Sequence, residues 1–558
     1  MSGETSDQPV VVLQSETAIT DGTAVQQKLI GAARTLQNLL KATLGPRGLD
    51  KMLYKTDGTT AVTNDGAKVV AELMVKHPAA KAFQSLAASQ ESACGDGVTS
   101  TLLFCGELLT ESERLLRLGL HPTIIVAGLQ SALSATLAAA AAIEISIEEN
   151  SDNEYLLDVA RTALSGRAAT AAHEQCARLA ADALNSVVPK PDGQPERTAR
   201  AEDVTMHLAG RGDIRESRLV RGVVIRRRII MDRMTTSLKS PKIAIFSTPL
   251  ALREMSRDAE IEVADADTLG AFIDAERQMR EDLLKILLAS GANAFFCKGE
   301  VDRDLQHLLI DADCFVAGEL DESELINLAA ATNARICGAP NTLEASDIGA
   351  AGYIEARRKP STERVEDEIE VGGCANPAIV TIVVHGSNQT ASEEVIRGLY
   401  DALRATALAS ETKQLLAGAG SSHAQLAAAV RTAATKESGR ERLAYEAFAS
   451  ALEIIPVTLI ENSGNDALDG MLALRSEIAT TPDQEIVRTS GESEMSTGDG
   501  ERINAQFTKV IGVCEDGQIG EVSGIWHASK TILHGIEAAT ETTCSMLRID
   551  QVISARGD

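Results

Sequence analysis

Apolar residues recur at helical spacing over most of the first 150 residues. The runs "AVQQKLIGAARTLQNLLKATL" and "GELLTESERLLRLGL" place them at i, i+3 and i+4, the period of an amphipathic helix. The turn signals "LGPRG", "NDG" and "GDG" interrupt this pattern. We therefore expect residues 25–150 to be helical, followed by two alanine-rich helices within residues 151–187.

The middle of the chain changes to short β-rich runs that alternate with helical ones. Strands are indicated by "RGVVIRRRII", "PKIAIFS", "ANAFFCKG", "DCFVAGEL" and "ARICGAP", and helices by "DTLGAFIDAERQMREDLLKILLASG" and "DESELINLAAATN". Such alternation is typical of an α/β unit, here of about 150 residues. After the strand "AIVTIVVHGSN", residues 393–480 and the final run "ASKTILHGIEAATETTCSMLRID" are helical again. The pattern predicts one helical domain built from both chain ends, with an α/β insert.

Three further stretches affect the class of protein. The window "AGLQSALSATLAAAAAIEI" is rich in Ala, Ser and Thr, which favours a buried helix over a membrane span. The N-terminal "MSGETSDQPV" lacks the basic and apolar regions of a signal peptide. Residues 480–502 are rich in Ser, Thr, Gly and Glu, which predicts a surface loop.

The net charge and the cysteines exclude several classes of protein. The formal net charge is −27, which argues against a role in coating nucleic acid. The nine cysteines include no CxxC pair, so we expect reduced and mostly buried thiols rather than a disulfide framework or a zinc site. Both features are typical of a soluble cytoplasmic protein.

The stretch "ACGDGVTSTLL" carries the clearest candidate chemistry. Asp96 stands between two glycines, and a carboxylate is a hard oxygen ligand suited to Mg²⁺. Flanking glycines allow phosphate to approach the backbone, and a helix that starts here would favour an anion at its N-terminus. The spacing does not match the GxxxxGK[ST] phosphate loop. By themselves these residues leave two interpretations open, a helix cap and a metal-phosphate site.

Four other turns could take part in such a site. They are "TLGPRG", "NDG", "LLAGAG" and "LIENSGNDALD", each of which is also an ordinary turn sequence. Backbone N–H groups in such turns can hold phosphate oxygens.

The order and separation of these turns resemble one family. The run "TLGPRGLDKML", "TNDGAKVV", "HPAAK", "GDGVTSTLL", "GLHPTIIVAGLQ" is similar to the N-terminal half of group II chaperonins, the thermosome and TRiC/CCT family. The resemblance continues through "SGANAFFCKG", "LLAGAG", "GRERLAYEAFASALEIIPVTLIENSGND" and "ATETTCSMLRIDQVI", and covers about residues 9–557.

The resemblance implies an α+β multidomain fold. A helical equatorial domain would be formed by both chain ends, with a small intermediate hinge domain and an α/β apical domain. In the family a helical protrusion, here expected around residues 250–285, forms a built-in lid. The implied division is 1–150 equatorial, 151–217 intermediate, 218–368 apical, 369–408 intermediate and 409–558 equatorial.

The resemblance also implies an ATP and Mg²⁺ site. Asp96 matches the Mg²⁺ ligand, Asp65 matches one of two aspartates that orient the attacking water, and Asp401 on the hinge domain matches the other. Phosphoryl transfer to water needs charge neutralisation and a positioned nucleophile, so an aspartate on a moving domain would gate hydrolysis. The positions that match the family's nucleotide-binding turns are Thr43, Leu44, Gly45, Pro46, Asn64, Gly66, Gly97, Val98, Thr99, Ser100, Arg167, Gly418, Ala419, Gly420, Asn462, Ser463 and Gly464.

Four substitutions depart from the family's usual site. Val98 replaces a threonine of "GDGTT", and Ala419 replaces the middle glycine of "GGG", where a positive φ would cost on the order of 1 kcal/mol. Arg167 stands in "TALSGR" where a lysine is usual, and His527 in "GIWHA" where an acidic residue lies near the ribose.

These observations predict an ATP-dependent chaperone subunit that encapsulates unfolded proteins within a double ring of like or paralogous subunits. We expect hydrolysis of Mg²⁺-ATP at a lower rate than in relatives, and neither nucleic-acid nor membrane partners. The alternative is a degenerate structural subunit that fills ring positions without turning over ATP. A metabolic enzyme would need a catalytic cluster within residues 215–370, where His307 and Cys314 stand alone in the sequence.

Overall fold

The computed structural model describes most of the chain and divides it into two compact units. Unit 1 comprises Met1–Thr170 and Thr412–Asp558, and unit 2 comprises Ala171–Glu411. The described residues are 18–21, 23–54, 60–73, 78–147, 154–166, 172–188, 198–227, 234–252, 266–357, 367–386, 389–480 and 510–554.

Unit 1 is mainly helical, and its helices come from both ends of the chain. The helices are α1 (Thr23–Lys41), α2 (Gly66–Glu72), α3 (Pro78–Cys94), α4 (Val98–Arg117), α5 (Pro122–Ile143), α6 (Glu154–Leu164), α12 (Ser421–Ala434), α13 (Arg442–Leu452), α14 (Ile454–Asn462), α15 (Ala467–Thr480) and α16 (Ser529–Leu547).

Small sheets complete unit 1. Strand β1 (Ala18–Asp21) pairs antiparallel with β21 (Gln551–Ser554), so the first and last described segments are neighbours. The other strands form two hairpins and a three-stranded sheet, with β2 (Lys51–Tyr54) on β3 (Thr60–Thr63), β18 (Val510–Val513) on β19 (Ile519–Val522), and β17 (Gln414–Ala417) between β4 (Ile145–Ser146) and β20 (Trp526–Ala528).

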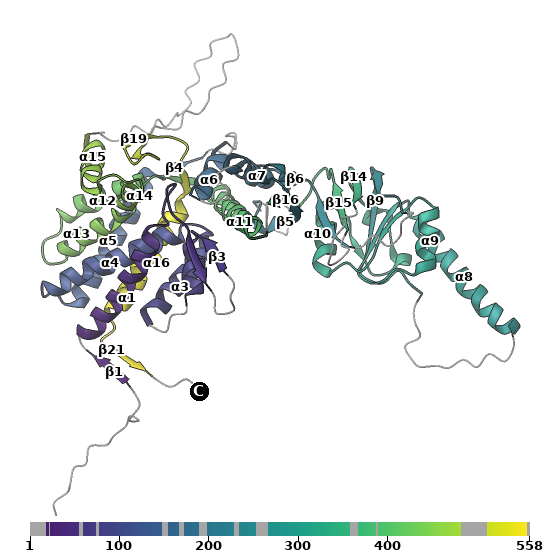
Figure 1. Ribbon diagram of the computed structural model, residues 1–558, viewed down its shortest axis with the longest axis horizontal. Helices are drawn as coiled ribbons and strands as arrows, with labels where there is room; N and C mark the ends of the chain where they lie inside the picture. The colour runs from purple at the N-terminus through teal and green to yellow at the C-terminus, as the bar shows by residue number, and fades with distance from the viewer. Residues whose placement is uncertain are drawn as a thin grey trace, which may run out of the picture. The chain divides into compact units, whose positions relative to one another are not determined.

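A large, mostly aliphatic core joins the two chain ends in unit 1. Helices α1, α4 and α16 run side by side (Figure 1). Leu102 of α4 and Ile536 of α16 are almost fully buried in the same cluster. Phe104 of α4 meets Phe448 of α13 edge to face, with ring centroids 5.4 Å apart. The predicted helical domain from both chain ends is therefore observed, with the small sheets named above beside its helices.

Strands lie within two of the ranges that were predicted to be helical, and the prediction is wrong there. Residues 25–150 include the hairpin of β2 and β3, and residues 393–480 include β17. In β3, Thr60–Thr63, exposed and less exposed positions alternate, and this period of two is too short to be seen against the long helical runs around it.

Two helical stretches are long and apolar enough to cross a membrane by composition, within the described residues. They are Pro122–Ile143, the predicted buried helix, and Arg442–Asn462. In the second, 72% of the apolar window is buried inside the protein, as in the core helices of globular proteins.

Unit 2 contains a parallel sheet whose central strands are buried on both faces. Strands β9 (Lys242–Phe246), β10 (Ala294–Cys297), β11 (Phe315–Ala317) and β12 (Ile336–Cys337) are ordered β11-β10-β9-β12, and β13 (Gly349–Ala350) joins antiparallel to β9. All four residues of β10 are buried, which explains its unbroken apolar run "AFFC". The helices of this region are α8 (Ala266–Ala289), α9 (Arg303–Asp311) and α10 (Glu322–Thr332).

Two further sheets and two helices complete unit 2. One sheet has the order β7-β15-β14-β8 and the other β5-β16-β6. Their bounds are β5 (Val204–Arg211), β6 (Arg218–Val220), β7 (Val223–Arg226), β8 (Ser237–Lys239), β14 (Tyr353–Arg357), β15 (Glu368–Gly372) and β16 (Val380–Gly386), with helices α7 (His173–Ser186) and α11 (Gln389–Thr412).

The prediction of a mixed helix and strand chain with more than one domain is confirmed. The finer division into five segments stays a prediction. The predicted surface loop at 480–502 lies outside the described residues except for Thr480, and so does part of the predicted protrusion, residues 253–265.

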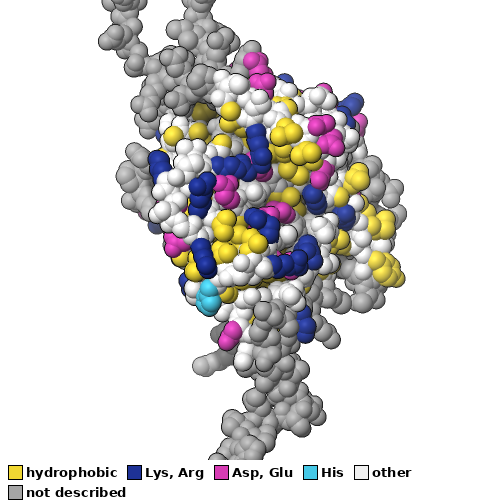
Figure 2. Space-filling model, turned by 90° about the vertical axis from the view of Figure 1, so that its left-hand side faces the viewer, with side chains coloured by type: hydrophobic (Ala, Val, Ile, Leu, Met, Phe, Trp, Pro, Cys, Tyr) yellow, Lys and Arg dark blue, Asp and Glu magenta, His cyan; other side chains and the backbone are white. Residues whose placement is uncertain are grey.

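Charged side chains of both signs lie on the face of the molecule shown in Figure 2. On the face shown in Figure 2, Lys and Arg side chains are scattered among apolar and acidic ones, although the whole chain is strongly acidic. The positive charge on this face is interrupted, unlike the continuous basic surface of proteins that coat nucleic acid.

Candidate functional site

The loop that contains Asp96 lies between two helices of unit 1. Helix α3 ends at Cys94 and α4 begins at Val98, so Gly95, Asp96 and Gly97 form a sharp connection. Gly97 is the N-cap of α4 with φ 80°, a left-handed conformation that favours glycine, and no side chain caps the helix. The first-turn N–H groups of α4 therefore remain available to an anion.

The "GAG" turn begins a second helix in the same way. Gly420 is the N-cap of α12 with φ 73°, again without a side-chain cap. Ala419, the preceding residue, has φ 53°. A positive φ is unfavourable for a residue with a Cβ, so the backbone strain that we expected at Ala419 is present. Gly418 is held by a hydrogen bond from its N–H to the carbonyl of Ile525, at 2.8 Å.

The "NDG" turn contacts the Asp96 loop directly. Asp65 is the N-cap of α2, and its carboxylate accepts a hydrogen bond from the N–H of Ala67 at 3.0 Å. A Cβ on Gly66 would lie 2.5 Å from Oγ1 of Thr99, so only glycine fits here. Asn64 donates a hydrogen bond to the carbonyl of Gly166.

The "TLGPRG" turn is fixed by α14. The side-chain amide of Asn462 donates to the carbonyls of Lys41 and Leu44, at 2.9 and 2.8 Å. These carbonyls lie at the C-terminal end of α1, so Asn462 satisfies them as a helix cap would. The Thr43 hydroxyl donates to the carbonyl of Leu40.

The hydroxyls of Ser100 and Ser463 are both engaged with backbone carbonyls close by in the sequence. Ser100 Oγ donates to the carbonyl of Gly97 at 2.9 Å, and Ser463 Oγ to that of Leu459 at 2.8 Å. Pro46 and Gly464 occupy the same turns as Gly45 and Ser463, and Gly464 has φ 85°.

His527 lies between the Asp96 loop and the "GAG" turn. Its Nδ1 is 3.8 Å from Oδ2 of Asp96, and its ring would lie 3.2 Å from a Cβ on Gly418. Burial, reinforced by His527, lowers the pKa of the nearby His423 to about 4, so His423 is neutral at neutral pH.

The residues fit a phosphate group and Mg²⁺. A Cβ on Gly97 would lie 2.9 Å from Thr531 Cγ2, and one on Gly420 would lie 2.8 Å from Pro456 Cβ, so both turns leave backbone rather than side chain at the site. The Asp96 side chain is 18% exposed. A single carboxylate such as that of Asp96 is enough for Mg²⁺, which usually takes phosphate and water as its other ligands.

The structure brings most of the predicted residues together in unit 1, with three qualifications. Asp401 lies on α11 of unit 2 and is buried. Arg167 lies outside the described residues. The Val98 side chain is 5% exposed and belongs to the core of unit 1.

Sequence reasoning missed the residue that supports the Asp96 loop. Gln90 of α3 is fully buried and donates a hydrogen bond to the carbonyl of Asp96. A signal was present, because Gln90 continues the buried stripe of Phe83, Leu86 and Ala87 at helical spacing. A polar residue on an apolar stripe needs partners, and these can be functional.

The chain thus combines a helical unit built from both of its ends, which carries glycine-capped helix N-termini and Asp96, with an inserted unit that contains a parallel sheet. Residues 36–557 match the model of the TCP-1/cpn60 chaperonin family, and this chain belongs to that family.

Curated relatives match over nearly the whole chain. Thermosome subunit beta of Archaeoglobus fulgidus is 33% identical over 550 residues, which is 99% of this chain and 95% of the relative. The thermosome subunit of Methanocaldococcus jannaschii is 33% identical over 98% of this chain and 95% of its own length. Thermosome subunit alpha of Archaeoglobus fulgidus is 33% identical over 549 residues, which is 98% of this chain and 95% of the relative. The predicted resemblance to group II chaperonins is confirmed.

Proposed function

We propose that this chain is an ATP-dependent chaperone subunit of a group II chaperonin ring. It binds Mg²⁺-ATP in unit 1 and couples hydrolysis to the encapsulation of unfolded proteins. The observation that carries the proposal is the pair of glycine-capped N-termini of α4 and α12. Helix α4 follows the Asp96 loop directly, and the turn before α12 lies against His527, whose Nδ1 is 3.8 Å from Oδ2 of Asp96. Family membership and the thermosome relatives support it.

The phosphates would be held mainly by backbone. The first-turn N–H groups of α4, and those of Ser422 and His423 in α12, would bind an anion, because the Ser421 N–H already donates to the Gly418 carbonyl. The partial positive charge of each helix N-terminus favours such binding. Asp96 would hold Mg²⁺, which supplies charge neutralisation at the phosphates. The turns at Thr43–Pro46 and Asn462–Gly464, locked together by Asn462, would border the rest of the nucleotide.

Two aspartates would position the attacking water. The Asp65 carboxylate accepts a hydrogen bond from the Ala67 N–H, and the family resemblance makes Asp401, on α11, the second aspartate. A catalytic pair divided between two units is complete only in a closed state, so hydrolysis would follow closure. Arg167, which lies outside the described residues, matches the family's usual lysine in the sequence.

The ring and its clients follow from the family. The thermosome relatives include subunits named alpha and beta, which supports assembly with like or paralogous subunits in a double ring. We assign residues 1–150 and 409–558 to an equatorial domain, 151–217 and 369–408 to an intermediate domain, and 218–368 to an apical domain that binds unfolded proteins. The protein would act in the cytoplasm.

The degenerate structural subunit is the less favoured alternative. Asp65, Asp96 and Asp401 are all present, and the similarity to thermosome subunits extends over 99% of the chain. Ala419 and His527 lie against the site and could still lower the hydrolysis rate.

Phosphate release from purified assemblies tests the proposal. We compare the wild type with Asp65→Ala, Asp401→Ala and the double variant, with Glu446→Ala as a surface control whose side chain is 40% exposed. Each catalytic variant should lose at least about tenfold in hydrolysis rate while retaining nucleotide binding, since general-base groups contribute factors of this size or more. Equal phosphate release by wild type and double variant would contradict the proposal.

A further inference from the structure

Gln90 makes three hydrogen bonds beneath the Asp96 loop. Its side chain is fully buried. The amide nitrogen Nε2 donates to the carbonyl of Asp96 at 2.9 Å and to the carbonyl of Thr531 at 3.0 Å. The amide oxygen Oε1 lies 2.7 Å from Nδ1 of His534. Both N–H donors of the Gln90 amide and one lone pair of its oxygen therefore take part in hydrogen bonds.

Chemistry fixes the orientation of this amide. A carbonyl oxygen only accepts, so the group that faces the carbonyls of Asp96 and Thr531 must be the NH₂ of Gln90. Oε1 then faces His534, and because an amide oxygen cannot donate, His534 Nδ1 must carry the proton. A reversed amide would set an oxygen against two carbonyl oxygens. The carbonyls of Asp96 and Thr531 and the N–H of His534 together hold the glutamine amide in one orientation, and we call this set of three hydrogen bonds the lock.

The lock determines the direction of the peptide that follows Asp96. The peptide bond is planar and trans, so a carbonyl and the next N–H point in opposite directions. Holding the Asp96 carbonyl toward Gln90 therefore turns the Gly97 N–H to the opposite side of the peptide plane. Space allows little else, since a Cβ on Gly97 would lie 3.1 Å from Gln90 Nε2 and 2.9 Å from Thr531 Cγ2.

The three partners come from distant parts of the chain. Gln90 belongs to α3, whereas Thr531 and His534 belong to the first two turns of α16. Helix α16 approaches closely because Gly535 has no side chain, and a Cβ there would clash with Thr101 Oγ1 of α4. The Asp96 loop is thus fastened to a helix from the other end of the sequence.

We propose that Gln90 and His534 are positioning residues for Mg²⁺-nucleotide binding. They set the orientation of the Asp96–Gly97 peptide and, through it, the direction of the Asp96 carboxylate. This inference rests on the proposed function, because it assigns Asp96 to the metal. Groups that orient a metal ligand typically contribute about 10- to 100-fold to metal affinity.

Two substitutions of His534 separate this role from simple packing. His534→Leu keeps an apolar body but removes the donor to Gln90. His534→Asn places an amide N–H near the position of Nδ1 and should restore the lock. Full-length assemblies are titrated with a non-hydrolysable ATP analogue, once with Mg²⁺ and once with EDTA, by calorimetry. The readout is the Mg²⁺-dependent gain in affinity.

We expect His534→Leu to lose about tenfold of that gain while its affinity in EDTA stays at the wild-type value. His534→Asn should keep most of the gain. A His534→Leu protein with the full gain would overturn the inference. So would equal losses with Mg²⁺ and with EDTA, since general loosening affects both.

Asp96→Asn distinguishes this inference from the proposed function. If wild type shows a Mg²⁺-dependent gain that Asp96→Asn lacks, the metal assignment holds, and the His534 variants decide the inference alone. If wild type shows no gain, or Asp96→Asn keeps it, the metal assignment fails and the inference falls with it.

Discussion

Val98 shows how burial decides the effect of a single residue. The sequence raised the question of a hydroxyl lost beside the phosphates, since the family usually has threonine here. In the structure this side chain belongs to the apolar core of unit 1, and only the backbone of residue 98 is at the start of α4. The Val98 side chain therefore contributes to the packing of the core, and residue 98 could contact a phosphate only through its backbone.

Val98→Thr should leave nucleotide affinity within about twofold and lower the free energy of unfolding by about 1 kcal/mol, the cost of burying a hydroxyl among apolar groups. Analogue titration and urea denaturation measure the two effects. An affinity gain above about fivefold would mean that the hydroxyl reaches the phosphates.

Ala419 is strained at the second phosphate turn. Its φ of 53° is unfavourable for any residue with a Cβ. Ala419→Gly should raise the free energy of unfolding by up to about 1 kcal/mol, because relief of strain exceeds the extra chain entropy of glycine. Urea denaturation of purified subunits tests this.

Gly512 supplies a matched control for Ala419. A Cβ on Gly512 would lie 3.1 Å from the Cβ of Ala419 and 3.1 Å from its carbonyl oxygen. Gly512→Ala should destabilise the wild type more than it destabilises the Ala419→Gly protein, since one of the two close contacts is gone. Equal and additive effects would show that the two residues do not press on one another.

The sequence identified some site residues and not others for a physical reason. Asp96 and the glycine turns lie in contiguous, recognisable stretches. Gln90 lies six residues before Asp96, and its partner His534 lies 444 residues from it in sequence. Contacts of that separation depend on how α3 and α16 pack, which periodicity alone does not determine.

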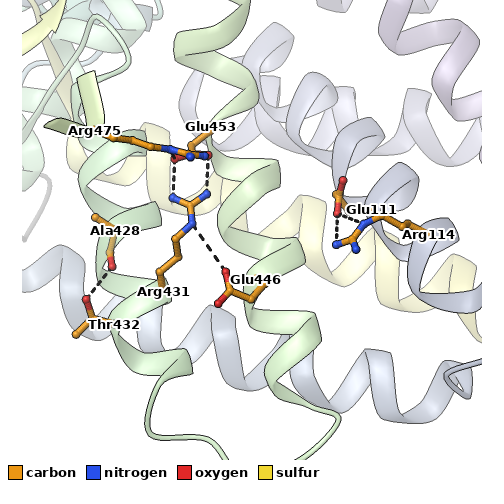
Figure 3. Close-up of polar contacts among 8 residues, drawn as sticks. All are labelled: Glu111, Arg114, Ala428, Arg431, Thr432, Glu446, Glu453 and Arg475. Atoms are coloured by element: carbon orange, nitrogen blue, oxygen red, sulfur yellow. Dashed lines mark hydrogen bonds and ion pairs between the residues drawn. The ribbon is translucent and has the colours of Figure 1, made fainter. Parts of the chain in front are cut away.

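At the scale of elements, one buried carboxylate joins three helical segments behind the site. Glu453 lies between α13 and α14, and its side chain is 5% exposed. Arg431 of α12 donates two hydrogen bonds of 2.6 Å to it, and Arg475 of α15 donates two more (Figure 3). Helix α12 begins at the "GAG" turn and α14 ends at Asn462, so this cluster fixes two elements of the candidate site.

The protonation of Glu453 gives this cluster a definite pH dependence. Burial raises the pKa of the Glu453 carboxyl, but hydrogen bonds from Arg431 and Arg475 more than offset it, so the pKa lies below its usual value of 4.5. The charged carboxylate therefore contributes its full stability above pH 4.5. The contribution is lost as the pH falls from 4.5 through the lowered pKa.

Glu453→Gln should lower the free energy of unfolding by about 2 kcal/mol at neutral pH, the range for hydrogen bonds to a charged group. The difference from wild type should shrink as the pH falls below 4.5. Denaturant unfolding over a pH series measures both.

Glu446→Gln is the control for this cluster. Glu446 lies 3.9 Å from Arg431 and is 40% exposed, so its removal should cost less than about 0.5 kcal/mol. A Glu453→Gln deficit that stays constant through the acid range would contradict the charge-based account.

At the scale of the whole molecule, periodicity was enough to predict the return of the chain to its first domain. Helical patterns at both ends and an alternating pattern between them predicted an insert, and the structure divides at 170/171 and 411/412. The exact boundaries could not be read from periodicity. Helix α6 lies within residues 151–217, which the family resemblance assigns to the intermediate domain, but it belongs to unit 1, where the Trp526 N–H donates to Thr162 of that helix.

Excising unit 2 tests whether nucleotide binding belongs to unit 1 alone. Residues 1–170 are joined to 412–558 by a flexible Gly/Ser linker of about ten residues. Because the core of unit 1 already combines helices from both chain ends, this protein should unfold cooperatively.

The shortened protein retains Asp96, Asp65 and both glycine-capped helices but lacks Asp401. We therefore expect Mg²⁺-nucleotide affinity within about threefold of the full chain, and hydrolysis no faster than in Asp401→Ala. Hydrolysis at the full-length rate would remove Asp401 from the mechanism, whereas a folded protein that no longer binds the nucleotide would mean that unit 2 supplies part of the binding site.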